Sequence, residues 1–380
     1  MGLDRIHTIA DLRRLARRRA PRMAFDFLDG GAGEGLAVEE NEAALARIKL
    51  LPRTLRDVSA RTQAVELFAR RLRGPIGISP VGFANVIWPQ TDTILARMAQ
   101  EAGIPYMLST AASTSIEEIV KVAPDAWFQL YVSDSDEIAF DMLRRAKEAG
   151  VKVVVLTVDV PLPGRRYRDM RNGFSLPLRP SLSTMLDFAL RPAWIRETIR
   201  HGTPTFANYA PYMKEGANAG TLAAFMASQV SPNLSPERIR RLRDAWSGTF
   251  IVKGILSAED ALDAADLGAD GLIVSNHGGR QLEAAPAAIN LLPEVVRVVG
   301  GRMPVMMDGG IRTGADIVKA YCLGADYVFA GRPFIFSTAA AGADGARRAL
   351  EIFHGEVDQT LGQIGATSMA DLDETYIRTT

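Results

Sequence analysis

The sequence predicts a (β/α)8 barrel, and two observations support this fold class. Eight short apolar runs recur along the chain, and several are continuous enough for strands buried on both faces of a parallel sheet. Helical segments lie between them, and this alternation, repeated eight times, is typical of a closed barrel. The predicted strands are Pro75–Pro80, Tyr106–Thr110, Trp127–Tyr131, Val153–Asp159, Phe250–Gly254, Gly271–Asn276, Val305–Gly310 and Tyr327–Arg332. The clearest helices, which open near Ser, Thr or Asp and close at Gly, are Thr91–Gly103, Asp136–Gly150, Ser257–Gly268 and Thr313–Gly324.

Two regions lie outside this repeat, within what we expect to be one domain of 380 residues. Residues 1–74 are predicted to form a helical N-terminal extension. Residues 178–232 interrupt the cycle after strand four, and a loop of this length inside a compact domain is usually functional or mobile. The insertion is therefore interpreted as a lid, a patch that contacts a membrane, or a mobile segment.

Charge and cysteine content limit the classes of function. The 44 basic and 44 acidic residues balance, which argues against a nucleic-acid partner. Cys322 is the single cysteine, so no disulfide forms within the chain, and its apolar helical setting predicts a small buried side chain. The basic N-terminus has no apolar core typical of a signal peptide. We expect a cytoplasmic protein, with peripheral contact at the inner membrane as the alternative.

The predicted strands end in polar residues or glycine. Barrel enzymes carry their active sites at the C-terminal ends of the strands, so these residues together outline one site. They are Ser79 to Gly82, Ser109, Gln129 with Tyr131, Thr157 with Asp159, Lys253, Ser275 to His277, Asp308 to Gly310, and Gly331 with Arg332.

The last two strands predict a phosphate-binding site. Glycines allow backbone N–H groups to approach a phosphate, a helix N-terminus adds partial positive charge, and arginine adds bidentate contacts. The segment Asp308–Arg312 precedes a helix, and Gly331 and Arg332 follow the last strand. The alternative is a pair of tight turns that close the barrel.

Residues 271–283, GLIVSNHGGRQLE, indicate acid–base chemistry. The strand delivers His277 to the barrel mouth, and Arg280 follows a Gly-Gly turn. A base beside a cation suits a substrate that carries both a removable proton and a carboxylate. Asp159 could orient the imidazole and stabilise its cation. Arg165 or Arg166 could supply a second cation, although both also fit a solvated cluster.

Lys253 ends an otherwise apolar strand and needs an anionic partner, either a ligand or a nearby acid. No HExxH or CxxC spacing predicts a metal site. The glycines at positions 30, 31, 33 and 35 follow a helical pattern and do not fit GxGxxG, which argues against a nicotinamide cofactor.

These motifs resemble the FMN-dependent 2-hydroxy acid oxidase/dehydrogenase family over nearly the whole chain. SNHGGRQLE is highly specific to the family, and WFQLYV, TVDVPLPGRRYRD, VKGILSAEDA and DGGIRTGADIVKAYCLGAD follow the family's order. The resemblance implies FMN as cofactor and oxidation of a small L-2-hydroxy acid to the 2-oxo acid. Two other classes remain, a non-redox FMN barrel isomerase and a non-catalytic flavin-binding protein, but neither needs the His-Gly-Gly-Arg stretch.

The resemblance also implies roles for the strand-end residues. His277 takes the substrate proton and Asp159 pairs with it, while Arg166, Arg280 and Tyr131 bind the substrate. Lys253 stabilises the reduced flavin. The remaining FMN contacts are the backbone of Pro80, Val81 and Gly82, hydrogen bonds from Ser109, Gln129, Thr157 and Ser275, and the ribityl-phosphate end at Asp308, Gly309, Gly310, Arg312, Gly331 and Arg332.

Three positions bear on substrate and acceptor. Phe27 stands where the family usually has a tyrosine that helps to hold the substrate carboxylate, and losing such a bond costs about 1.5–3 kcal/mol. Phe27 and Ala111 together favour a roomier pocket for an aromatic or longer-chain acid, with L-lactate as the alternative. Gly82 resembles members that pass electrons to a quinone or cytochrome, and an oxidase that uses oxygen is the alternative. We also expect a homotetramer, and the 178–232 insertion resembles a membrane tether.

Overall fold

Eight parallel strands form a closed barrel in the computed structural model, which describes residues 3–174, 181–213, 225 and 231–378. The strands are hydrogen-bonded in the order β4-β11-β10-β9-β8-β7-β6-β5, and a parallel bridge between Ile78 and Tyr106 joins the two ends of the sheet. All eight predicted strands are confirmed. Their bounds are β4 Ile76–Ile78, β5 Met107–Ser109, β6 Trp127–Tyr131, β7 Val153–Thr157, β8 Thr249–Ile255, β9 Gly271–Val274, β10 Val305–Asp308 and β11 Tyr327–Ala330.

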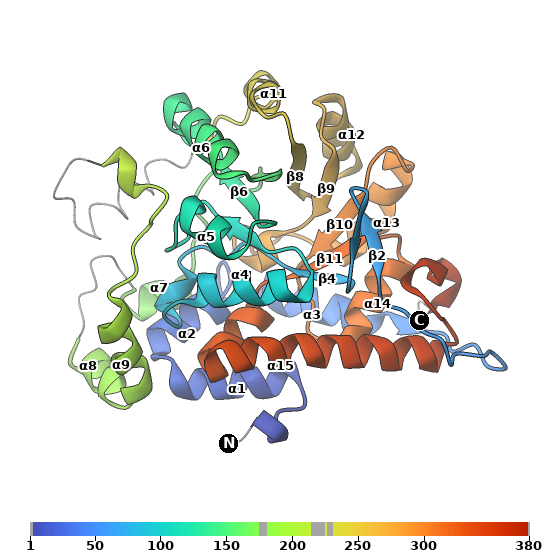
Figure 1. The fold of residues 1–380 in the computed structure, drawn as a ribbon, viewed down its shortest axis with the longest axis horizontal. Coiled ribbons are helices and arrows are strands. Elements are labelled where there is room, and N and C mark those ends of the chain that lie inside the picture. Colours follow the sequence, from blue (N-terminus) through green and yellow to red (C-terminus); the bar gives the residue numbers. More distant parts are fainter. Residues whose placement is uncertain (1–2, 175–180, 214–224, 226–230, 379–380) are drawn as a thin grey trace.

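Helices follow the strands and cover the outside of the barrel (Figure 1). The four predicted helices are confirmed, and serine or threonine caps begin three of them: Ser135, Ser257 and Thr313 each accept a backbone N–H of the first turn. The last helix runs beside the first along one edge of the molecule (Figure 1). The helices of the repeat are α4 Thr91–Ala102, α5 Ile116–Val122, α6 Asp136–Ala149, α11 Pro236–Ala245, α12 Ala258–Asp266, α13 Ala288–Val299, α14 Gly314–Cys322 and α15 Arg332–Ile364.

Only the first part of residues 1–74 is helical. Helices α1 (Ile9–Arg19), α2 (Arg22–Asp29) and α3 (Leu36–Arg47) are followed by extended chain that includes β1 (Lys49–Leu50), which pairs with β12 (Ile377–Arg378). The expectation of a helical extension is therefore wrong beyond Arg47.

An antiparallel hairpin, β2 (Val65–Leu67) and β3 (Arg70–Leu72), closes the barrel at the N-terminal ends of its strands. Its turn residues Phe68 and Ala69 both have positive φ, at 49° and 56°. Such turns usually carry Asn or Gly, so the sequence holds no turn signal here. Leu67 and Leu72 pack into the barrel interior against a cluster that includes Trp127 and Phe329, and this apolar plug leaves the opposite end for chemistry.

The insertion after β7 is partly helical. Helix α7 (Tyr167–Arg171) leads into it, and its described residues form α8 (Leu182–Ala189), α9 (Pro192–His201) and the 3-10 turn η3 (Ala210–Tyr212). Residues 178–180, 214–224 and 226–230 of the predicted insertion lie outside the described part. Among the described residues, no helix is long and apolar enough to cross a membrane.

Candidate active site

A cavity that is partly open to solvent lies at the C-terminal ends of the strands. Ligand and cofactor sites of barrel proteins lie at this end. Most of the predicted site residues line it: Phe27, Pro80, Val81, Gly82, Tyr131, Thr157, Lys253, His277, Arg280, Asp308, Gly309, Gly310, Arg312, Gly331 and Arg332. Five predicted site residues do not line the cavity themselves: Asp159, Arg166, Ser109, Gln129 and Ser275.

His277 is held between an acid and a hydroxyl. Its Nδ1 lies 2.9 Å from Oδ1 of Asp159, and its Nε2 lies 3.3 Å from the Tyr131 hydroxyl. The backbone N–H of His277 donates to Ser275 Oγ. A φ of 58° places His277 in the left-handed region, which few residues other than Gly adopt, although Asn, Asp and His adopt it more often than the rest. Such backbone geometry concentrates at functional sites.

Asp159 is the anionic partner of this imidazole. Burial raises the pKa of Asp159, but His277 and Lys253 outweigh burial and hold that pKa below its usual value. The side chains of His277 and Asp159 are only 18% and 13% exposed, so water screens the pair weakly. An ionised Asp159 therefore stabilises the imidazolium that forms when the ring accepts a proton.

Arg280 is a cation without an acidic partner. Its Nη1 donates to the carbonyl oxygens of Phe27 and Gly30, and no described carboxylate lies within 4 Å of its guanidinium. Burial lowers the pKa of Arg280, and the neighbouring charges of Arg166 and Arg332 lower it further. An anion that enters the cavity beside Arg280 relieves both penalties.

Arg166 and Arg280 flank the same aromatic ring. Their guanidinium carbons lie 5.2 and 5.1 Å from the centroid of Phe27, within cation–π range. Arg166 also forms an ion pair with Asp169 at 3.2 Å. Arg165 has its side chain exposed, and its carbonyl accepts the N–H of Gly33. The structure thus places Arg166, and not Arg165, beside Arg280 at the ring of Phe27.

Lys253 already has an acidic partner in the resting protein. Its Nζ lies 3.2 Å from Asp308 Oδ2 and donates to Ser275 Oγ at 2.7 Å. Ser79 Oγ donates to the same carboxylate at 3.0 Å. The acidic partner of Lys253 is therefore Asp308. Ser79, which the sequence marks only as a strand end, also belongs to this cluster.

Two buried polar atoms at the strand ends lack a protein partner. Gln129 Nε2 and Thr157 Oγ1 are inaccessible to solvent and make no hydrogen bond, although Gln129 Oε1 accepts from Ser109 Oγ at 3.0 Å. Buried polar groups in folded proteins are nearly always paired. A ligand with a polar ring edge satisfies both atoms, so these residues fit the isoalloxazine ring of FMN.

The predicted phosphate end contains two left-handed glycines. Gly309 and Gly310 have φ of 103° and 81°, and a Cβ on Gly310 would lie 2.6 Å from the carbonyl oxygen of Asn41. Arg332 donates to the carbonyls of Leu28, Gly30 and Gly278, and Arg312 pairs with Glu42 at 2.9 Å. Both arginines line the cavity while tying the N-terminal helices to it.

The Asn41–Asn276 pair is a contact that sequence reasoning missed. Each amide nitrogen donates to the other amide oxygen at 2.9 Å, and both side chains are buried. The pair joins helix α3 to the His277 turn. Neither residue stands in a motif that would reveal a partner more than two hundred positions away. Among the residues described, no cluster of three His, Cys, Asp or Glu side chains could hold a metal ion.

Three features together define a flavin-dependent oxidoreductase: the closed barrel, the unpaired buried polar atoms of Gln129 and Thr157, and the His277–Asp159 pair. Residues 16–379 match the family described as FMN-dependent dehydrogenase, and the chain belongs to this family. FMN is therefore its cofactor.

Three relatives show the range of the family. The chain is 39% identical to "(S)-mandelate dehydrogenase" of Pseudomonas putida over 98% of its own length and 94% of that protein. It is 40% identical to "4-hydroxymandelate oxidase" of Amycolatopsis orientalis, over 95% of each chain. It is 36% identical to "L-lactate dehydrogenase" of Caulobacter vibrioides, over 98% and 97%.

A solved structure has the same fold throughout. The crystal structure described as monotopic membrane protein (S)-mandelate dehydrogenase superposes with a TM-score of 0.95 at 39% identity, covering 99% of this chain and 100% of that one.

Proposed function

We propose that this protein oxidises an aromatic L-2-hydroxy acid to the 2-oxo acid, with His277 as the base. The observation that carries the proposal is Arg280, a cation without an acidic partner three residues from a histidine–aspartate pair. A substrate carboxylate supplies the missing anion and brings the adjacent hydroxyl-bearing carbon to the imidazole.

Different side chains of the protein bind the substrate, accept its proton and hold the cofactor. Arg280 and Arg166 bind the carboxylate, and Tyr131 contacts the substrate hydroxyl beside Nε2 of His277. His277 takes a proton at Nε2, and Asp159 stabilises the resulting imidazolium at Nδ1. FMN supplies the two-electron acceptor when bound. Gln129, Thr157, Ser109 and Ser275 would hold its ring.

The aromatic preference rests on Phe27. Its ring lines the cavity and stacks on Phe174, with centroids 4.7 Å apart. Replacing a carboxylate-binding tyrosine by this apolar pair favours a substrate that gains contact area from a ring. Ala111 supports the preference less directly, because it packs against Gly82 and not at the cavity wall. Two of the relatives act on mandelate or 4-hydroxymandelate by name.

The acceptor in this proposal is a quinone or cytochrome. Gly82 lines the cavity, and a Cβ there would lie 2.9 Å from Cβ of Ala111, which real contacts do not reach. The space beside the cofactor is therefore preserved by glycine, as in the dehydrogenase members. Rapid reoxidation by oxygen would instead support an oxidase.

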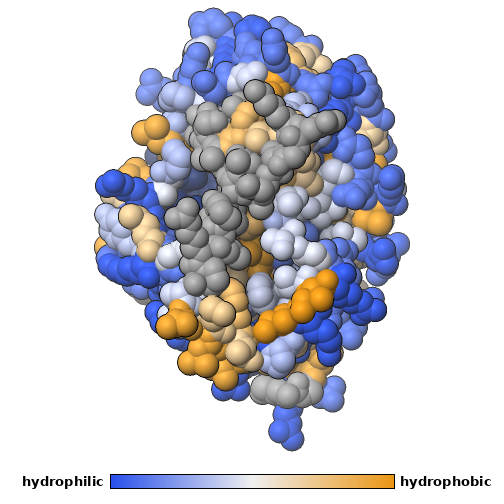
Figure 2. Space-filling view, turned by 90° about the vertical axis from the view of Figure 1, so that its left-hand side faces the viewer, coloured by the Kyte–Doolittle hydropathy of each residue, from blue (hydrophilic) through white to orange (hydrophobic). Residues whose placement is uncertain are grey.

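Helix α8 supports peripheral contact with a membrane. Leu182, Met185, Leu186 and Leu190 are 87%, 56%, 65% and 64% exposed, and no residue of α8 is buried. Apolar residues gather in the lower part of the face shown in Figure 2, on the side that carries α8 and α9. An exposed apolar helix near Arg191 and Arg196 suits the interface of an anionic bilayer.

The membrane contact is tested by cosedimentation with vesicles that contain anionic lipid. Leu182→Asp with Leu186→Asp should abolish binding, since charge on the apolar face opposes insertion. Leu55→Asp, at a fully exposed leucine elsewhere, is the matched control and should bind as the unaltered protein does. Undiminished binding of the double variant would reject this contact.

The proposal includes a homotetramer, as the family resemblance implies. Light scattering of the detergent-solubilised protein gives the mass directly, and a monomeric mass of 41.2 kDa would reject it.

The catalytic proposal is tested by anaerobic stopped-flow bleaching of the flavin with (S)-mandelate, L-lactate and glycolate. We expect mandelate to reduce the flavin fastest, and His277→Gln to bind FMN normally but to be reduced about a thousandfold more slowly. His7→Gln, at an exposed histidine, is the control and should be unchanged. Near-normal reduction of the His277 variant would refute the role of this base.

A further inference from the structure

A short stretch in the middle of the insertion is buried against the barrel. Phe206, Asn208 and Tyr209 are 5%, 0% and 2% exposed, in contrast to the exposed helix α8. We call residues 206–208 the anchor segment. It contacts the loop after β4, which carries Gly82, and the end of β5 at Ser109 together with the loop that follows it.

Asn208 binds the loop after β5 with both ends of its amide. Its Nδ2 donates to the carbonyls of Ser109 and Thr110, each at 3.4 Å, and its Oδ1 accepts the N–H of Ile116 at 3.0 Å. The backbone of the next residue back, Ala207, donates to the Ala112 carbonyl at 3.1 Å. The whole turn between β5 and α5 is thereby fixed by the insertion.

Phe206 binds the loop after β4. Its ring stacks on Phe83 with centroids 4.6 Å apart. Phe83 has a φ of 58°, and its N–H donates to the carbonyl of Ala111 at 2.8 Å. The strained turn directly after Gly82 is therefore held from one side by the anchor segment and from the other by the β5 loop.

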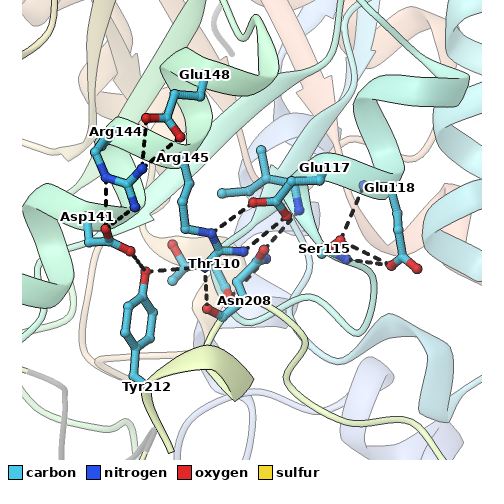
Figure 3. Close-up of polar contacts among 11 residues, drawn as sticks. Thr110, Ser115, Glu117, Glu118, Asp141, Arg144, Arg145, Glu148, Asn208 and Tyr212 are labelled. Carbon is cyan, nitrogen blue, oxygen red and sulfur yellow. Dashed lines mark hydrogen bonds and ion pairs between the residues drawn. The ribbon is translucent and has the colours of Figure 1, made fainter.

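A second layer of contacts holds Asn208 from outside (Figure 3). Arg145 on α6 donates to the Asn208 carbonyl at 2.9 Å and forms a two-point ion pair with Glu117, at 2.9 and 3.1 Å. Tyr212 accepts from the same guanidinium and donates to Asp141 at 2.7 Å. This layer reaches Asn208 only through its backbone.

We infer that the anchor segment positions the flavin-facing loops, with Asn208 as its principal positioning residue. Ser109 lies directly between Asn208, which binds its carbonyl, and the Gln129 amide, which accepts from its hydroxyl. Loosening Asn208 therefore shifts the two side chains assigned to the isoalloxazine edge. The inference rests on the proposed function for that assignment, and it gives the insertion a role in cofactor retention that is separate from its exposed helices.

The test measures FMN retention without substrate. Each holoenzyme is diluted to nanomolar concentration, and free FMN is followed by its fluorescence. We expect Asn208→Ala to raise the FMN dissociation constant about tenfold, because three buried groups lose their partner. Phe206→Leu keeps most of the apolar volume but loses the ring stack, and we expect a rise of about threefold. Amide hydrogen exchange at residues 109–116 should quicken in the Asn208 variant.

Tyr212→Phe is the matched control, since it deletes two polar contacts of the outer layer and leaves the Asn208 amide in place. Its FMN affinity should stay within about twofold of the unaltered protein. Equal retention by all variants, or equal loss in the Tyr212 variant, would overturn the inference. If Asn208→Ala does not fold, Phe206→Leu decides alone. A wild-type flavin that no 2-hydroxy acid bleaches would refute the proposed function without touching these affinities.

Discussion

Replacing Asp159 by asparagine removes the charge beside His277 and keeps the shape. The amide oxygen can still accept from Nδ1 across the 2.9 Å contact, so the ring should retain its orientation. In the proposed mechanism, what changes is the stabilisation of the imidazolium that forms when Nε2 of His277 takes the substrate proton. The substitution therefore separates the electrostatic role of Asp159 from its positioning role.

The size of the effect follows from the separation of the two charges. Two unit charges about 4 Å apart, measured between their centres, attract by about 4 kcal/mol at an effective dielectric constant of about 20. The low exposure of both side chains makes this value more suitable than that of bulk water. Since about 1.4 kcal/mol corresponds to tenfold, Asp159→Asn should slow flavin reduction by about three orders of magnitude.

Anaerobic stopped-flow reduction by a saturating hydroxy acid measures this step directly. FMN affinity and substrate affinity should stay within a few-fold, because neither contact involves the charge of Asp159. Asp358→Asn, at an acid paired with Arg61 on the opposite side of the barrel, should leave reduction unchanged. A loss below tenfold in the Asp159 variant would show that the charge does not stabilise the proton transfer.

Three further perturbations test other parts of the site. Arg280→Lys should raise KM for the acid at least tenfold with FMN binding unchanged, because an ammonium cannot form a two-point contact with a carboxylate; an unchanged KM in steady-state kinetics would contradict this. Gly82→Ala forces its new methyl against Ala111, and we expect faster reoxidation by oxygen relative to a quinone, measured with an oxygen electrode. Burial raises the pKa of Asp92 to about 6 from 3.8, so its contribution to stability is full below pH 3.8 and is lost as the pH rises through 6. In urea unfolding, the free energy of unfolding of Asp92→Asn should rise relative to that of the unaltered protein by up to about 3 kcal/mol between pH 3.8 and 6. A difference between the two proteins that does not change with pH would refute this.

The strands and most of the cavity lining were predictable because a parallel barrel brings every strand end to one rim. Once Thr157, Lys253 and Ser275 are recognised as strand ends, their proximity follows from topology and needs no knowledge of side-chain packing. The same logic could not place side chains relative to one another. Whether Lys253 faces a ligand or Asp308 depends on rotamers that no local pattern encodes.

The missed features depend on contacts between distant segments. The β2–β3 hairpin turns at Phe68 and Ala69, which both have positive φ without being turn-forming residues. Phe68 packs against the interior of the barrel, whereas Ala69 is exposed. Asn208 stands in an insertion whose composition indicates only a loop, yet it is completely buried. Long-range amide contacts of this kind leave no periodicity in the sequence, so only the folded chain reveals them.

The distribution of charge supports the proposed position of the substrate. Lys253 is balanced by Asp308, and Arg312 by Glu42, so neither holds an unopposed charge at the cavity wall. Among the described arginines that line the cavity, Arg280 and Arg332 have only carbonyl oxygens as hydrogen-bond partners, and Arg332 stands at the proposed phosphate end of the cavity. In the proposed mode of binding, the FMN phosphate takes the Arg332 end of the cavity. A 2-hydroxy acid seated by its carboxylate at Arg280 presents its oxidisable carbon to His277. In this proposal the Arg280 guanidinium selects both the charge of the substrate and its direction in the cavity.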